Sequence, residues 1–527
     1  MKKLKLENKH IWLLILSFVL TCFSTVIRMW NGSLKELVLY FVLFFVIYTV
    51  VIFGLDKFSK QIFEKMHINS IEKRIYDKWS DKKFYFVIWG LLILGWLPAY
   101  LALFPGTFGY DAPWQMFQVI GQTPLSSHHP LVHTLLLGFI MNTGNKIFGT
   151  YNAGVAIFCA MQGIVVAESI AYSFIVLKKK KLAFPIVVIS LAWCMFNPAI
   201  QVVTFNITKD VLFGAAFVHF VVDCYNHIFH IVPDSKWTTA KLIISGLFVC
   251  LLRNQGIYVI LAFAIIYFIF VRKDKKYVLS MLSVVAMAWL FFTISHSCFG
   301  VEKGNLREML SVPMQQLAGV CKDYYEGQPV NLSQEEFEQF TQLVPAEALS
   351  TMSITSADPI KSVFNTEEFK SDIPGYVGLY FKVGIHNIKD YIMTYGPMIL
   401  GYWDMSLKGT RTISLNNTFP ELSQQLGITQ QSLLPGYYDF LYDYVWNTMG
   451  KRIPLFSWIM QPGICLWIIP AMLVLAIIRK DKKLALVTLL PVLFFGTLML
   501  GPVSLMRYLY PLTILTPWMI ALLFKHG

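Results

Sequence analysis

The sequence predicts an all-α, polytopic transmembrane helical protein. Hydrophobic residues make up 56% of the 527 residues, charged residues only 14%, and the mean hydropathy is +0.56. A soluble domain does not need so apolar a composition. Lysines gather in short loops between apolar stretches, where they indicate which loops lie on the cytoplasmic side of the membrane. The formal net charge of +13 therefore does not indicate a nucleic-acid partner.

The first three spans are expected at 11–27, 36–54 and 84–104, because a helix needs about 20 apolar residues to cross a bilayer. No small-residue cleavage site follows the first stretch, so it is interpreted as a retained span and not as a signal peptide. The second and third spans are joined by a long basic loop, which the positive-inside rule places in the cytoplasm. The third span therefore leads to the outside.

The first outer loop is expected at residues 105–152. Its first part, with residue 104, reads FPGTFGYDAPWQMFQVIGQTPLSSHHP. The apolar stretch 131–149 is interrupted by polar residues, as in an amphipathic helix on the membrane surface. The return span, 153–177, ends in four consecutive lysines that mark the cytoplasmic side.

Two further features place charged residues at outer turns. Spans at 182–200 and 211–229 form a hairpin whose outer turn contains Lys209 and Asp210. The apolar stretch 242–271 would make a helix about 45 Å long, and basic residues flank both of its ends. Two short helices with Arg253 at their outer turn explain both observations.

The remaining chain completes about twelve spans, with both termini in the cytoplasm. A span at 277–296 ends a transmembrane module, 1–296. The extracytoplasmic region 297–457, a mixed domain, holds 11 Lys and Arg against 17 Asp and Glu, a balance that supports its outer position. The C-terminal part, 458–527, holds spans near 458–478, 484–502 and 505–524.

Polar residues that are costly to keep near a membrane converge on the predicted outer side. These are Asp111, His128, His129, Lys209, Asp210, Arg253 and Arg507. Each has a purely structural alternative. Asp111 could cap a helix beginning at Pro113, the histidines could be turn residues, the arginines interfacial anchors, and Lys209 with Asp210 a local ion pair.

Taken together, these residues suit a reaction of a lipid-linked sugar. A carboxylate at the membrane surface can act as general base toward a hydroxyl, while nearby cations hold a phosphate. A polyprenyl-phosphate sugar presents its sugar just outside the bilayer and its phosphate at the surface. Phosphate is a good leaving group, so one aspartate and a few cationic residues would suffice.

The order of these motifs resembles the first outer loop of GT-C superfamily glycosyltransferases. An aspartate follows the third span, and a His-Pro then opens a surface helix that ends in glycine. More closely, six stretches look like a group of bacterial membrane proteins related to that superfamily and mainly of unknown function. They are FPGTFGYDAPWQ, LSSHHPLVHTLLLG, TKDVLF, LLRNQGIY, SVPMQQLAGV and RYLYPL.

The resemblance implies an integral-membrane, inverting, polyprenyl-phosphate-sugar-dependent glycosyltransferase of the cell membrane, acting on the extracytoplasmic side. Its acceptor would be a cell-wall polymer, glycolipid or exopolysaccharide. By position, Asp111 matches the catalytic base, and Asp210 a second acidic residue for the acceptor or a metal. The donor phosphate would be bound by Arg253 and Arg507, helped by His128, His129 and Lys209. Many members carry Asp-Glu in the first loop, whereas Ala112 follows Asp111 here, so a requirement for Mg²⁺ or Mn²⁺ stays open.

Region 297–457 is expected to recognise the acceptor. It contains a helix-like part, 332–349, and an aromatic part, 435–446, whose rings suit sugars or anchor a helix in the interface. Three other classes of function stay open. A flippase or exporter of a lipid-linked saccharide needs a polar path through the membrane, and few ionisable residues lie mid-span. An O-acyltransferase would need a histidine inside the bilayer, and a scaffold or sensor would tolerate loss of Asp111.

Overall fold

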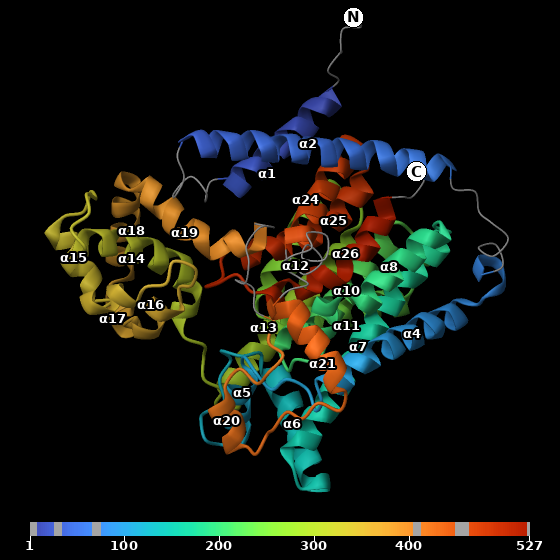
Figure 1. Cartoon of the computed structure of the whole chain (residues 1–527), viewed down its shortest axis with the longest axis horizontal. Coiled ribbons are helices and arrows are strands. Elements are labelled where there is room, and N and C mark those ends of the chain that lie inside the picture. The colour runs from blue at the N-terminus through green and yellow to red at the C-terminus, as the bar shows by residue number, and fades with distance from the viewer. Residues whose placement is uncertain (1–7, 26–33, 66–74, 404–412, 448–462, 524–527) are drawn as a thin grey trace, which may run out of the picture. The chain divides into compact units, whose positions relative to one another are not determined.

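The computed structural model describes residues 8–25, 34–65, 75–403, 413–447 and 463–523. Its helices form two compact units, each assembled from separate stretches of chain (Figure 1). The smaller unit is Met1–Val51, Gly304–Arg411 and Gly496–Leu505, and the larger is Ile52–Lys303, Thr412–Phe495 and Met506–Gly527. No strand occurs in the described residues, so the all-α prediction is confirmed. The predicted boundary at 457 and both chain ends lie outside the described residues.

Four described helices are long and apolar enough to cross a membrane. They are α4 (Asp81–Ala102), α7 (Tyr151–Lys179), α10 (Lys209–Ile228) and α13 (Lys275–Cys298). A fifth span results if α8 (Phe184–Phe196) and α9 (Pro198–Thr204), bent by 51° at their break, count as one. Membrane association is therefore supported by the described helices, while the count of about twelve spans stays a prediction.

Two predicted features of the helical pattern, a helix at 131–149 and a break at Arg253, are present. The stretch 131–149 forms α6 (Leu131–Phe148), which ends where Gly149 adopts a left-handed φ of 71°. The long apolar stretch divides into α11 (Lys236–Leu252) and α12 (Gln255–Phe270), with Arg253 in an extended conformation between them. The break at Arg253 is confirmed.

The larger unit contains further helices before α6 and in the C-terminal part of the chain. A short helix, α5 (Ala112–Val119), begins directly after Asp111. The C-terminal stretches form α24 (Gly463–Ile478), α25 (Lys482–Leu498), η5 (Met506–Leu509) and α26 (Tyr510–Leu523). The aromatic stretch 435–446 forms α21 (Pro435–Tyr442) and a π-helical turn, η4 (Asp443–Asn447), and α20 is Pro420–Gln425.

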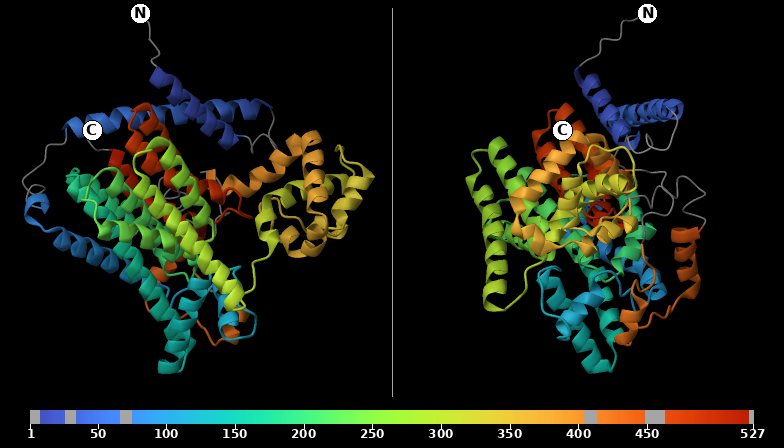
Figure 2. Two further views of the ribbon diagram at one scale, coloured as in Figure 1. Left: turned by 180° about the vertical axis from the view of Figure 1, so that it is seen from behind. Right: turned by 90° about the vertical axis from the view of Figure 1, so that its left-hand side faces the viewer.

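Helix α10 is the centre of the larger unit. It packs against α7, α11 and α26, and 89% of its most apolar window is buried. These helices lie around it in both views (Figure 1, Figure 2). Because α10 is enclosed by protein, it can carry polar side chains that a lipid-facing helix would not tolerate.

The smaller unit has its own apolar core, as a separate compact unit requires. Helices α14 (Ser311–Tyr325), α18 (Ile373–His386) and α19 (Ile388–Trp403) pack together. The predicted helix-like part 332–349 contains α15 (Gln334–Thr341), which starts with a capping box between Ser333 and Glu336. The remaining helices here are α1 (Asn8–Thr25), η2 (Leu306–Leu310), η3 (Ala346–Thr351), α16 (Asp358–Val363) and α17 (Thr366–Ser371). Helix α2 (Leu34–Lys65) extends beyond the predicted span 36–54.

The loop before α5 is fixed against the turn that precedes α10. The Thr107 backbone N–H donates to the carbonyl of Phe205 at 3.0 Å, and the Ile207 N–H donates to the carbonyl of Thr107 at 2.9 Å. Gly106 allows this approach with a φ of 130°. A Cβ at that position would lie only 2.2 Å from the Cys159 sulfur. The bridge sets Asp111 close to the first turn of α10.

A second segment holds the same loop from the other side. The Phe108 N–H donates to the Asn417 side-chain oxygen at 2.8 Å, and the Tyr110 N–H to the Thr418 hydroxyl at 2.6 Å. Tyr110 has a left-handed φ of 53°, which costs a residue with a Cβ some free energy. These contacts therefore fix the backbone immediately before Asp111.

We expect Gly106→Ala to lower the free energy of unfolding by about 1–3 kcal/mol from the backbone conformation alone, with further loss from the clash against Cys159. Gly90→Ala is the matched control, because a Cβ on Gly90 meets nothing within 4 Å and alanine favours a helix. Thermal unfolding of the purified proteins in detergent measures both changes. An equal effect of the two substitutions would contradict the account of the loop.

Candidate active site

Asp111 lies at the meeting point of several cationic groups. Its Oδ2 atom is 3.0 Å from Lys209 Nζ, 3.3 Å from an Arg507 guanidinium nitrogen and 3.9 Å from His129 Nδ1. The side chain is only 17% exposed. It precedes α5 but makes no side-chain hydrogen bond to the helix start. The predicted alternative of a helix-capping role is therefore not seen.

The surroundings of Asp111 favour its ionised form. Burial raises the pKa of the carboxyl, but Arg507 and then Lys209 lower it more, so that the pKa is held well below its usual range. Burial and Lys209 together lower the pKa of His129 from 6.5 to about 3. His129 is consequently neutral at physiological pH, and Lys209 and Arg507 are the charged neighbours of Asp111.

Asp210 and Arg253 form a separate, fully enclosed ion pair. Asp210 is completely buried, and its Oδ1 accepts a hydrogen bond from the Arg253 guanidinium. Arg253 also donates through Nε to Gln255 at 2.6 Å and lies over the ring of Tyr508. The other carboxylate oxygen of Asp210 accepts from the Thr208 hydroxyl at 3.0 Å. This pair joins the start of α10 to the break between α11 and α12.

Arg507 connects the two carboxylates. One guanidinium nitrogen faces Asp111 Oδ2 at 3.3 Å and Asp210 Oδ2 at 3.8 Å. The guanidinium lies 4.3 Å from the ring centre of Tyr110, a stacking that arginine favours. Its Nε–H is buried and has no hydrogen-bond partner among the described residues. A buried donor without a partner is costly, so this N–H is available to an anionic ligand.

The cluster carries one more positive than negative charge. Among the described residues, the carboxylates that Lys209, Arg253 and Arg507 face are those of Asp111 and Asp210. In a poorly hydrated site, such an excess favours an anion. The arrangement can therefore bind a phosphate beside a carboxylate.

The structure brings together all but one of the predicted site residues. Asp111, His129, Lys209, Asp210, Arg253 and Arg507 form one cluster. His128 is exposed, and its ring packs against that of His129 with centroids 4.5 Å apart. The catalytic and binding roles of these residues stay predictions.

Three site residues were not predicted from the sequence: Tyr110, Thr208 and Tyr508. Each is a direct sequence neighbour of a predicted residue, in the motifs GYDAP, TKD and RYLY. Two stack their rings on arginine and one links Asp210 to Arg507. Adjacency to a charged residue was the available signal, but only the fold shows which neighbours turn toward the cluster.

The cluster does not suit a divalent cation. No group of three or more metal-ligating side chains occurs within the described residues. The Asp210 oxygens already face Arg253, Thr208 and Arg507, and the ion pairs of Asp111 are with Lys209 and Arg507. A metal would have to displace these cations or sit beside them, which electrostatics opposes. The residues present therefore fit an anion better than Mg²⁺ or Mn²⁺.

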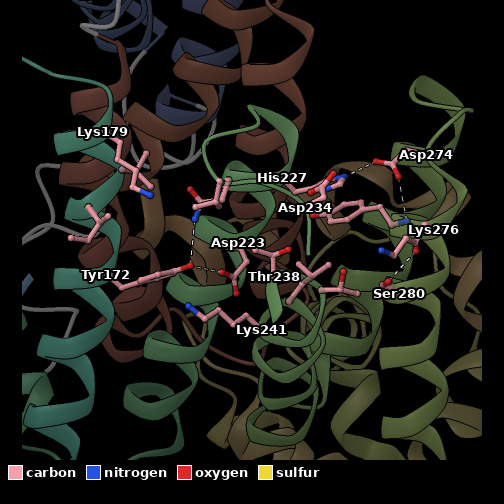
Figure 3. A pocket seen from close by; sticks show the side chains of 17 residues that line it. Tyr172, Lys179, Asp223, His227, Asp234, Thr238, Lys241, Asp274, Lys276 and Ser280 are labelled. Atoms are coloured by element: carbon pink, nitrogen blue, oxygen red, sulfur yellow. Dashed lines mark hydrogen bonds and ion pairs between the residues drawn. The ribbon is translucent and has the colours of Figure 1, made fainter. Parts of the chain in front are cut away.

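A second polar cluster lies inside the spans. Glu168 of α7 pairs with His219 of α10 at 2.6 Å and accepts from Tyr85 at 3.1 Å. One turn along α10, Asp223 accepts from Tyr172 at 2.7 Å. Tyr172 and Asp223 help to line a polar cavity of about 230 Å³, in which Lys241 lies close by (Figure 3). The expectation that few ionisable residues lie mid-span overlooked this grouping, because the sequence does not show that they face one another.

The Asp210–Arg253 pair predicts a strong dependence of stability on either partner. Arg253→Met should lower the free energy of unfolding by about 3–5 kcal/mol, because it leaves a buried carboxylate uncompensated. The double variant Asp210→Asn with Arg253→Met should lose less than Arg253→Met alone. Thermal unfolding in detergent tests this, with Arg307→Met as the control. Arg307 makes a partly exposed pair with Glu308 and an exposed hydrogen bond to the Ser362 carbonyl, so its loss should cost less than about 1 kcal/mol.

His129 predicts a pH-dependent term in stability. Below pH 6.5 the unfolded chain binds a proton at this histidine, whereas in the folded chain the histidine binds a proton only near pH 3, because its pKa is lowered to about 3. Stability should therefore decrease as the pH is lowered through this window, with His129 contributing at most about 1.4 kcal/mol per pH unit. His129→Gln should remove this contribution and leave that of His133, whose pKa is lowered by burial to about 4. Melting temperatures of wild type, His129→Gln and the control His386→Gln, an exposed histidine, are compared from pH 7 to 4. Parallel curves for wild type and His129→Gln would refute the assignment.

Comparison with known proteins supports one assignment. A family model described as a family of unknown function, DUF6020, matches residues 120–526. No curated protein and no solved structure matches the chain. The matched region includes the cluster residues from His129 to Arg507, while Asp111 lies just before it. Since the match covers well over half of the chain, the protein belongs to the DUF6020 family.

Proposed function

We propose that this protein is a membrane glycosyltransferase that moves a sugar from a polyprenyl-phosphate donor to an extracytoplasmic glycan or lipid acceptor. The observation that carries the proposal is the excess of positive charge directly beside Asp111. A phosphate bound by Lys209 and Arg507 would lie next to a carboxylate, the combination that transfer from a phosphate-linked sugar requires. The unpaired Nε–H of Arg507 would gain an acceptor when phosphate binds.

The two oxygens of Asp111 have different surroundings. All ion pairs of this carboxylate end on Oδ2, and no hydrogen bond to Oδ1 occurs within the described residues. In our proposal Oδ1 accepts the proton of the acceptor hydroxyl while Oδ2 stays oriented by Lys209. Because Oδ1 has no hydrogen-bond partner among the described residues, it can accept a proton, and this supports a catalytic base over a purely structural carboxylate.

Binding of the donor would also strengthen this base. Arg507 and Lys209 hold the pKa of Asp111 well below its usual range, which makes the free carboxylate a weak base. A donor phosphate would share both cations and weaken their attraction for Asp111, so the pKa would rise toward the range useful for proton transfer. The base would then be strongest when the donor is in place.

The proposed reaction is a single displacement. The acceptor oxygen bonds to the anomeric carbon, its proton passes to Asp111 Oδ1, and the bond from that carbon to the phosphate oxygen breaks. The electron pair leaves with polyprenyl phosphate, whose added negative charge is stabilised by Arg507 and Lys209. Attack opposite the leaving group inverts the anomeric centre. The proton on Asp111 is finally lost to water.

Arg253 has a different part in this scheme from the one that the resemblance implies. Its guanidinium is engaged with Asp210 and Gln255, so it has little capacity for a phosphate. We assign it as a positioning residue that keeps the start of α10, and with it Lys209, in place. His129, neutral and adjacent to Asp111, would offer a hydrogen bond to the donor.

A second candidate is a flippase or exporter of a lipid-linked saccharide. The polar cluster of Glu168, His219, Tyr172 and Asp223 favours it, because ionisable groups inside spans are expensive and often line a substrate path. The side chains of Glu168 and His219 are 36% and 27% exposed, which leaves them accessible to a polar group. This candidate predicts dependence on Glu168 and not on Asp111.

Asp111→Asn should reduce sugar transfer by at least about 100-fold, since it removes the base and keeps the size of the side chain. Membranes containing each variant are supplied with polyprenyl-phosphate donors that carry a radiolabelled sugar, and label in endogenous acceptors is measured. Asp77→Asn is the control, because Asp77 forms an exposed ion pair with Lys181. Detergent-extracted protein is quantified for each variant, so that loss of protein is not taken for loss of activity.

The same assay separates the two candidates. Equal transfer by wild type and Asp111→Asn would remove Asp111 from the mechanism. If no transfer occurs and labelled lipid changes membrane face in a manner abolished by Glu168→Gln, the exporter replaces the transferase. Loss in Asp111→Asn with normal transfer in Glu168→Gln supports the transferase.

A further inference from the structure

An apolar groove of about 1120 Å³ lies in the larger unit, at the lysine-rich ends of its helices. The end of α12, the end of α24 and the start of α25 form its walls. Its apolar lining includes Ile266, Phe270, Leu473, Ile477, Leu486 and Leu489. Phe270 is 66% exposed and Ile477 is 57% exposed. Such surfaces at helix ends in a membrane protein are suited to hydrocarbon chains.

The rim of the groove is cationic. It carries Lys273, Lys480, Lys482 and Lys483, and none of these ammonium groups lies within 4 Å of a carboxylate among the described residues. The three aspartates of the rim are engaged elsewhere. Asp234 and Asp274 both contact His227, at 3.0 and 2.6 Å, and Asp481 Oδ1 accepts from the Leu484 N–H at 2.9 Å.

His227 with these two aspartates forms a wall shared with the polar cavity on its other side. Asp234 and Asp274 lie beside the His227 ring in that cavity (Figure 3). His227 contacts one oxygen of each of these two aspartates, and neither aspartate lies within 4 Å of a groove lysine among the described residues. The groove therefore combines an apolar floor with a rim of four lysines and three aspartates, a formal balance of +1, in which none of the lysines is held in an ion pair among the described residues.

We propose that this groove binds an anionic phospholipid, with its acyl chains on the apolar floor and its phosphate among the four lysines. A free anion would leave the apolar walls exposed, and a zwitterionic lipid would bring a cation of its own toward the lysines. Each lysine near an anionic head group strengthens the attraction for it. The positive-inside rule independently predicts that this lysine-rich end faces the cytoplasm, where anionic lipids are available.

The test uses the full-length protein in detergent and native mass spectrometry with added lipids. The probes are phosphatidylglycerol and phosphatidylcholine with identical acyl chains. The variant Lys273→Gln, Lys482→Gln, Lys483→Gln removes three positive charges from the rim. The matched control, Lys82→Gln, Lys236→Gln, Lys275→Gln, removes three charges from exposed lysines that do not line the groove.

We expect wild type and control to retain phosphatidylglycerol over phosphatidylcholine, and the rim variant to bind phosphatidylglycerol at least about tenfold more weakly. Inorganic phosphate should not displace the bound lipid. Equal losses in the two triple variants would show general charge attraction and overturn the site, as would equal binding of the two lipids. Stronger retention of polyprenyl phosphate than of phosphatidylglycerol would overturn the choice of a phospholipid. Melting temperatures confirm that each variant is folded.

Discussion

The buried ion pair between Asp210 and Arg253 is the interaction on which the candidate site depends. A fully buried carboxylate is tolerated only with a partner, and here that partner comes from the break between α11 and α12. The pair thus fixes where α10 begins relative to α11 and α12. Because Asp210 is satisfied by Arg253, its neighbour Lys209 is left to contact Asp111.

The position of Asp111 follows from backbone contacts more than from its own charge. The bridge between Thr107 and the residues before α10, and the side-chain acceptors Asn417 and Thr418, hold the loop on two sides. The carboxylate then meets Lys209 and Arg507, which come from positions almost 300 residues apart in the sequence. This prearranged geometry avoids reorganisation when charge develops on a bound ligand, which is how electrostatic catalysis gains most.

Part of this arrangement could be predicted from the sequence, because it depends on local patterns. The end of α6 at Gly149 and the break at Arg253 are visible as interruptions of apolar stretches, and topology alone gathered the charged residues on one side. Pairing is a different matter, since it depends on side-chain direction across helices. Three pairings could be identified only from the fold. They are Glu168 with His219, Arg253 with Asp210, and Lys209 with Asp111.

Helix α10 carries both functional candidates along its length. Lys209 and Asp210 are at its first turn, and His219, Asp223 and His227 follow at four-residue spacing, so they share one face. Enclosure by α7, α11 and α26 lets a single helix hold these polar groups along its whole length. A transferase needs only the first turn, whereas an exporter would need the whole face to move or to hydrate. Helix α10 is the most enclosed of the described candidate spans, so it has little room to move. The proposed transfer reaction at its first turn is therefore better supported than transport along its polar face.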